Sequence, residues 1–303
     1  MWLQIVKLHV QVVKDVRNMN SLNEPRKLSQ EEHIKTRRMW KEIFSDESES
    51  FLNYYYSEKI KDNEIYVIED RDKIVSMIHL NPYDVRVGTE QYRLHYIVGV
   101  ATDPEYRRRG LMAKLLNYVM DVMRGRGEPF TYLMPVAKEI YEPFGFEFVC
   151  MKSMEEMKGK ELKNNPPEVF AATEKDCKEL AVFANSFLEK YDVVAVRSEA
   201  YYSRMLLEFG SEHGGILLAK RDGKIVGAAH YAKGEQYEVN EFLFQEKEDF
   251  EHCLYYLTGN ETDTIFCKVD GNEKSKPSIM AKVLRPDFEM DLKQAKVFIN
   301  EWV

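Results

Sequence analysis

The most informative segment of the chain, residues 94–116, reads LHYIVGVATDPEYRRRGLMAKLL. Its first part, residues 94–101, is almost continuous in apolar and β-favouring side chains, which predicts a buried strand. Residues 102–107 then form a turn, because Pro104 fixes the backbone there. From Arg109 onward the spacing changes to that of a helix. The segment therefore predicts a strand that meets a helix through a short basic loop.

The predicted helix has one apolar face. Its stripe consists of Leu111, Leu115, Val119 and Val122, at the spacing of an amphipathic helix. Gly125 and Gly127 predict its end. A second strand is predicted at residues 130–134, and it should return parallel beside the first. Because ligands of open α/β sheets bind at the carboxyl ends of such strands, the basic loop lies where a ligand would bind.

The basic loop has the composition of an anion site. A helix N-terminus presents unpaired amide donors and the positive end of the helix dipole. Gly110 lets the backbone approach a ligand closely, and Arg107, Arg108 and Arg109 add charge and forked donors. Three adjacent arginines also occur in ordinary solvated turns. The strand before them and the amphipathic helix after them favour a pyrophosphate cradle.

The composition limits the classes of partner. The chain has 303 residues and a net charge of −8, which argues against nucleic acid, since phosphate binding needs a basic face. The negative charge suits a cationic substrate such as an amine. The four cysteines form no C-x-x-C pair and have no zinc-module spacing to histidine, so we expect no metal site.

The beginning of the chain is fairly apolar. Residues 1–16 read MWLQIVKLHVQVVKDV, and Lys7, His9 and Lys14 interrupt the apolar run. This pattern is not a secretory signal, and it is shorter than the roughly 20 apolar residues of a membrane span. We therefore expect residues 1–24 to be an N-terminal extension, either a helix or an extra strand, and the protein to be cytoplasmic with no membrane partner.

Three patterns of the first half recur in the same order in the second half. They are a capping box at residues 29–32 and 173–176, a Tyr-Tyr-Ser run at residues 55–57 and 201–203, and a strand–turn–strand pattern at residues 65–80 and 216–231. The separation of equivalent residues grows only from 144 (29 to 173) to 151 (73 to 224). The repeat predicts two copies of one mixed α/β (α+β) fold, the alternative being two unrelated α/β domains.

A linker is predicted between the two halves. Residues 157–167 read MKGKELKNNPP, a charged, Asn-rich stretch that ends in two prolines. We therefore expect one domain at residues 25–157 and a second at residues 168–303.

The basic loop also carries a family resemblance. Residues 107–112, RRRGLM, resemble the Arg/Gln-x-x-Gly-x-Gly/Ala pattern in motif A of the GCN5-related N-acetyltransferases (GNAT), although Met112 departs from the final small residue. Together with IYEPFGF at residues 140–146, the loop is similar to the Eis-like (enhanced intracellular survival) acetyltransferases. That resemblance implies two tandem GNAT (acyl-CoA N-acyltransferase) folds, the second degenerate, and it covers residues 25–300. The Eis-like proteins assemble into rings, which implies a homo-oligomer.

The resemblance implies which residues bind acetyl-CoA as cosubstrate. The backbone of Val100, Ala101 and Thr102 would bond the pantetheine arm, and residues past the next strand would line its other side. The loop and the first helical turn would wrap the pyrophosphate. The implied cofactor-binding set is Val100, Ala101, Thr102, Arg107, Arg108, Arg109, Gly110, Leu111, Met112, Ala113, Val136 and Ala137.

Tyr141 matches the family's tyrosine in Ile-Tyr-x-x-Phe-Gly, and the resemblance implies that it is the general acid that protonates the leaving thiolate. A phenol with a pKa of about 10 is a proton donor at neutral pH.

The identity of the general base stays open. The resemblance assigns it in longer members to the carboxylate of a third, sterol-carrier-like domain, whereas this chain stops at Val303. The candidates are the Val303 carboxylate, if a last helix at residues 292–302 folds back, His95, or a water relay.

The second half has no equivalent cradle. Residues 237–251, YEVNEFLFQEKEDFE, are acidic and glycine-free, so they would repel a pyrophosphate. We expect this half to shape an acceptor cleft instead. The predicted function is N-acetyl transfer from acetyl-CoA to a primary amine (aminoglycoside-like, polyamine or lysine) by direct attack. The alternative is a non-catalytic acyl-CoA-binding sensor or scaffold.

Overall fold

A computed structural model describes residues 24–271 and 275–301 of the chain. The expected extension at residues 1–24 lies outside the described part except for Glu24, and Val303 lies outside it entirely. The first half contains β1 (Arg26–Lys27), η1 (Gln30–Thr36), α2 (Arg37–Ile43), α3 (Glu49–Ser57), η2 (Lys59–Lys61), β2 (Glu64–Asp70), β3 (Lys73–Val87), β4 (Glu90–Thr102), η3 (Pro104–Tyr106), α4 (Leu111–Gly125), β5 (Phe130–Leu133), α5 (Lys138–Tyr141), η4 (Glu142–Phe144) and β6 (Glu147–Lys158).

The second half follows with a similar order of elements. It contains β7 (Glu168–Ala171), η5 (Glu174–Asp176), α6 (Cys177–Leu188), β8 (Val193–Ala195), α7 (Glu199–Ser211), β9 (Gly215–Arg221), β10 (Lys224–Lys233), β11 (Tyr237–Phe244), α8 (Lys247–Thr258), β12 (Thr264–Asp270), β13 (Lys276–Val283) and β14 (Val297–Phe298). Among these described elements, no helix is long and apolar enough to cross a membrane.

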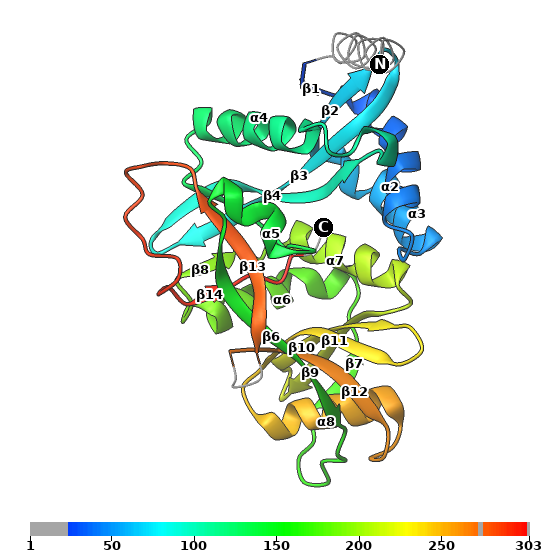
Figure 1. Ribbon diagram of the computed structural model, residues 1–303. Coiled ribbons are helices and arrows are strands. Elements are labelled where there is room, and N and C mark those ends of the chain that lie inside the picture. The colour runs from blue at the N-terminus through cyan, green and yellow to red at the C-terminus, as the bar shows by residue number, and fades with distance from the viewer. Residues whose placement is uncertain (1–23, 272–274, 302–303) are drawn as a thin grey trace, which may run out of the picture.

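The expected strand–loop–helix–strand unit is confirmed. β4 leads through the basic loop into α4, and β5 returns parallel to β4, with Tyr96 opposite Tyr132. Gly125 is the last residue of α4. One face of this sheet packs on α4, and the other packs on α2 and α3 (Figure 1). The fold is the mixed α/β architecture that the sequence predicts, in which a largely antiparallel sheet carries helices on both faces.

Some local features of the first half recur in the second half of the structure. Ser29 and Thr173 each open a helical segment with a complete capping box, and the strand pairs β2–β3 and β9–β10 are antiparallel hairpins. The repeat also places two buried histidines in equivalent positions on β3 and β10. His79 and His230 lie 151 residues apart, the same separation as Lys73 and Lys224, and burial lowers the pKa of His79 to about 3 and that of His230 to about 4.

The two halves share strands. β13 comes late in the chain, yet it pairs with β5 on one side and with β6 on the other. The C-terminal part of β6 then pairs antiparallel with β12 of the second half. β6 and β13 therefore run from one half into the other (Figure 1), and a single sheet continues from β1 to β7. Residues 276–283 thus complete the sheet of the first half.

The expected last helix at residues 292–302 is wrong. Residues 297–298 form β14, which pairs parallel with β8. The buried Lys152 ammonium donates to the Ile299 carbonyl, and the buried Arg197 guanidinium bonds Glu301 at 2.8 Å. These tertiary partners hold the segment extended, because helical backbone would withdraw both acceptors from buried cations.

Candidate active site

β4 and β5 diverge at the site. Tyr96 and Tyr132 are their paired residues. Beyond this pair β4 continues to Thr102, whereas β5 ends at Leu133. Backbone amides and carbonyls on the β5 side of β4 are thereby released from the sheet, and polar backbone groups need other partners. Such a splayed pair can hold an extended, amide-containing ligand.

A bulge in β4 lies at the same place. The pairing with β3 shifts register between Met77–Ala101 and His79–Val98, and Gly99 has a φ of 59°. A Cβ added at Gly99 would lie 2.5 Å from the Trp40 ring, so both the backbone angle and the close approach of the indole require glycine. The bulge turns the backbone of β4 toward the space between the halves.

The basic loop is ordered by its own contacts. The Asp103 carboxylate accepts from the Glu105 amide at 2.9 Å and pairs with the Lys73 ammonium at 2.7 Å. Arg107 donates to the Thr102 carbonyl at 3.2 Å, and the Arg109 guanidinium lies over the Tyr106 ring. These contacts give the loop a defined hydrogen-bonded conformation.

The same loop leaves its donors at the surface. Arg107, Arg108, Arg109 and Gly110 are exposed. Arg108 and Gly110 have φ angles of 61° and 75°, and Gly110 caps α4, whose first-turn amides have no intrahelical acceptor. Cation side chains and helix amides are thus adjacent and open to solvent, as a pyrophosphate site requires.

A cavity of about 370 Å³ lies between the two halves. Its first-half wall consists of Trp40, Phe44, Glu47, Phe51, Tyr96, Ile97, Val98, Gly99, Val100, Met134, Val136 and Tyr141. Its second-half wall consists of Glu208, Phe209, Glu212, Ala232, Glu238 and Asn240, from α7, β10 and β11. The bulged end of β4 therefore faces a mixed aromatic and acidic chamber.

The structure places the predicted site residues in two groups. Val100, Val136 and Tyr141 line the cavity. The loop residues 107–110 and the first turn of α4, residues 111–113, lie beyond the end of β4. Ala101 and Thr102 join the two groups along β4, and Ala137 precedes α5.

Tyr141 ends α5 with its side chain buried at the cavity wall. The residue is 6% exposed, its ring contacts Phe146, and burial raises the pKa of its phenol to about 12.

His95 has a different environment. Its Nδ1 lies 2.7 Å from the Glu128 carboxylate, which also accepts from the His95 amide. His95 does not line the cavity, so its contacts are those of a structural residue.

The first half of the chain is similar to a known protein family. Residues 24–149 match the acetyltransferase (GNAT) domain family. Residues 24–149 are thus similar to a GNAT acetyltransferase domain, and this match supports an acyltransferase that uses an acyl-CoA. No curated protein matches the chain.

Solved structures share the fold of the whole chain. A probable N-acyltransferase from Enterococcus faecalis is 16% identical, with a TM-score of 0.71 over 87% of this chain and 73% of that one. A GCN5-related N-acetyltransferase from Kribbella flavida is 18% identical, with a TM-score of 0.66 over 88% and 72%. An Eis protein from Mycobacterium abscessus is 10% identical, with a TM-score of 0.58 over 87% and 73%. At these identities the likeness is one of fold.

Sequence reasoning missed Glu47, Glu208 and Glu212, whereas Glu238 and Asn240 lie in the acidic segment 237–251 that the sequence had singled out. The four carboxylates line one cavity and come from both halves. Asn240, which is 7% exposed, belongs to the same wall, and its Oδ1 has no hydrogen-bond partner within the described ranges. Acidic composition of the second half was the one available signal, because no local pattern links residues so far apart in the sequence.

Proposed function

We propose that the protein is an N-acetyltransferase that transfers the acetyl group of acetyl-CoA to a primary amine. The observation that carries this proposal is the cavity shared by the end of β4, Tyr141 and four carboxylates. A thioester held along β4 and an amine held by the carboxylates would meet in this chamber. Holding two reactants in one site removes much of the entropic part of the barrier.

The cavity favours a cationic acceptor with an apolar portion. The carboxylates of Glu47, Glu208, Glu212 and Glu238 attract an ammonium group. Trp40, Phe44, Phe51 and Phe209 supply aromatic faces for carbon chains and for cation–π contact. The unpartnered Oδ1 of Asn240 accepts a hydrogen bond from an N–H donor. Polyamines and lysine side chains combine an ammonium group with a carbon chain, and aminoglycoside-like compounds share the ammonium groups.

In this proposal the backbone of Val100, Ala101 and Thr102 holds the pantetheine arm, and Val136 and Ala137 line its other side. Residues Arg107 to Ala113 bind the pyrophosphate through side chains and helix amides. Tyr141 is the general acid: its phenol protonates the thiolate sulfur as the C–S bond breaks. Attack is direct, since the described cysteines are all buried and none lines the cavity.

We also propose one acyl-CoA site per chain and an Eis-like tandem arrangement. In the second half, only Gln245 and Glu246 connect β11 to α8, and the first turn of α8 carries Glu248 and Asp249. This connection has no arginine or glycine and would repel a pyrophosphate. The recurrence of hairpins and capping boxes in both halves supports the tandem arrangement.

Coenzyme A release from acetyl-CoA tests the proposal. Spermidine, an aminoglycoside and a lysine peptide are each added as acceptors, and the acetylated product is identified by mass spectrometry. We expect at least one amine to raise coenzyme A release above the rate of uncatalysed hydrolysis. If acetyl-CoA binds in calorimetry while no amine stimulates release, the chain is an acyl-CoA-binding sensor and the proposal is wrong.

A further inference from the structure

Glu208 differs from the other carboxylates of the cavity. It is 7% exposed, whereas Glu47 and Glu238 are exposed and Glu212 is half-buried. The Tyr54 hydroxyl donates to Glu208 Oε2 at 2.8 Å, across the contact between α3 and α7. This bond orients the carboxylate and fixes α7 against the first half.

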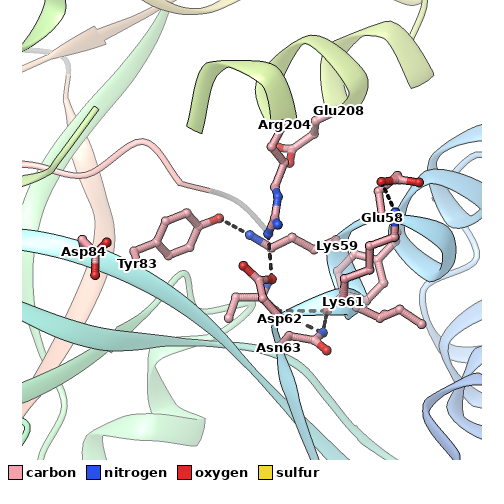
Figure 2. Close-up of polar contacts among 12 residues, drawn as sticks. Glu58, Lys59, Lys61, Asp62, Asn63, Tyr83, Asp84, Arg204 and Glu208 are labelled. Atoms are coloured by element: carbon pink, nitrogen blue, oxygen red, sulfur yellow. Dashed lines mark hydrogen bonds and ion pairs between the residues drawn. The ribbon is translucent and has the colours of Figure 1, made fainter. Parts of the chain in front are cut away.

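Two cations lie near this carboxylate, the buried Lys59 and the half-buried Arg204 (Figure 2). Figure 2 shows Lys59 and Arg204 near Glu208 where α7 crosses the first half. The Lys59 ammonium is fully buried and donates to the Tyr83 hydroxyl at 2.7 Å, and Arg204 pairs with Asp62 at 2.7 Å. Both cations are thus held by other partners, and neither forms an ion pair with Glu208.

We propose that Glu208 is the general base that takes the proton from the acceptor ammonium before attack. The proposal rests on the proposed function. It follows from three geometric facts: Glu208 lines the same cavity as Tyr141 and the β4 bulge, its carboxylate is anchored by Tyr54, and it is the buried carboxylate of that wall. A base must be within hydrogen-bond reach of the proton that it removes and must have a defined orientation.

The electrostatic surroundings suit this role. Burial raises the pKa of Glu208, while Lys59, the Tyr54 hydrogen bond and Arg204 oppose the rise and Glu301 adds to it. The other acids of the cavity that face it are Glu47, Glu212 and Glu238. A carboxylate with a raised pKa is a stronger base toward an ammonium group than a solvated one.

Glu208 and Tyr141 both transfer protons in the proposed reaction. Glu208 first takes one proton from R–NH₃⁺, which leaves a neutral amine. The nitrogen lone pair forms the C–N bond to the thioester carbonyl carbon, and the C–S bond then breaks. Tyr141 gives its proton to the sulfur and recovers one from the new amide nitrogen, while Glu208 releases its proton to solvent. One acetamide, one thiol and one proton result.

Glu208→Gln tests the proposal with two acceptors of the same carbon skeleton, propylamine and its terminally trifluorinated analogue, whose amine is less basic. At neutral pH we expect the variant to lose about 100-fold in kcat/KM with propylamine. We expect a clearly smaller loss with the fluorinated amine, since more of it is already neutral. Acetyl-CoA affinity should be unchanged. Glu199→Gln, an exposed acid in the first turn of α7, is the control and should match the parent protein.

Equal losses with both amines, or no loss, would overturn the proposal. Tyr54→Phe gives an independent readout if the Gln variant folds poorly, because it keeps the carboxylate and removes a hydrogen bond that lowers its pKa. The acid limb of the kcat/KM profile should therefore move to higher pH, and an unmoved limb contradicts the assignment. If the parent protein acetylates no amine, the proposed function itself fails.

Discussion

At the scale of single residues, Tyr141 is the side chain whose replacement should change turnover without changing acetyl-CoA binding. Its phenol lies at the cavity wall, and burial holds its pKa at about 12. Burial disfavours the charged phenolate, so the group stays protonated throughout the usual assay range. A general acid must carry its proton when the thiolate leaves, and this environment provides that condition.

Tyr141→Phe should lower kcat by about 100-fold while the Kd for acetyl-CoA stays close to that of the parent protein. The ring and its contact with Phe146 remain, so only the proton donor is lost. Steady-state kinetics and calorimetry measure the two quantities separately. In the parent protein, no alkaline loss of kcat from Tyr141 is expected below about pH 12. Unchanged turnover in the variant would remove Tyr141 from the mechanism.

Gly99→Ala should destabilise the protein and weaken acyl-CoA binding. The added methyl group meets the Trp40 ring, and the backbone angle is left-handed, so we expect a loss of about 2 kcal/mol in the free energy of unfolding. Denaturant unfolding measures it. Gly125→Ala is the matched control, because its Cβ would meet nothing within 4 Å, and it should be neutral or stabilising. Similar stability of both variants would argue against a rigid bulge.

At the scale of elements, the loop between β4 and α4 distinguishes the two halves. It contains three arginines and a glycine in a defined conformation, whereas the two-residue β11–α8 connection has none. The helices that follow, α4 and α8, each pack on strands of their own half. The difference in ligand binding that we propose therefore resides in loop chemistry rather than in the helix dipole.

Combined replacement of Arg107, Arg108 and Arg109 by alanine should weaken acetyl-CoA binding by about 10-fold or more, since each charge-assisted hydrogen bond contributes about 1.5–3 kcal/mol. Calorimetry at two salt concentrations measures the loss, and the variant should be less salt-sensitive. Lys247→Ala, at the start of α8, serves as the control and should bind like the parent protein. If both variants bind equally well, the pyrophosphate lies elsewhere.

At the scale of the whole molecule, the two halves form one continuous sheet. β13 lies between β5 and β6, and β6 continues to β12. The cavity has walls from both halves. The linker at residues 157–167 remains a prediction. Because β6 pairs with β12 and β13 pairs with β5, each half depends on strands of the other.

A fragment of residues 24–167 should not fold independently. It lacks β13, so β5 has an open edge and β6 loses both of its partners, and unpaired edges favour aggregation. We expect aggregation or a non-cooperative unfolding curve by circular dichroism, and recovery of acetyl-CoA binding when residues 168–303 are coexpressed. A soluble fragment that binds acetyl-CoA alone would show that the halves are autonomous.

Local sequence was sufficient to predict the strands and the helix around the basic loop. Strand 94–101, the helix after Gly110 and the parallel return of β5 follow from side-chain periodicity and turn chemistry, which act over a few residues. The repeat, with its capping boxes and hairpins, was predictable for the same reason. The family resemblance then assigned roles to Arg107 and Tyr141 that periodicity could not assign.

Tertiary structure alone decided the acceptor side. The interleaving of β6 with β13, the approach of Glu208 to Tyr54 and the pairing of β14 with β8 depend on contacts between segments distant in the chain. Such contacts have no local sequence signal, because their free energy comes from burial and pairing that exist only after the chain has folded. The sequence alone therefore predicted the strand–loop–helix unit at which we propose that an acyl-CoA binds, and the packing of the halves determined which residues line the cavity opposite β4.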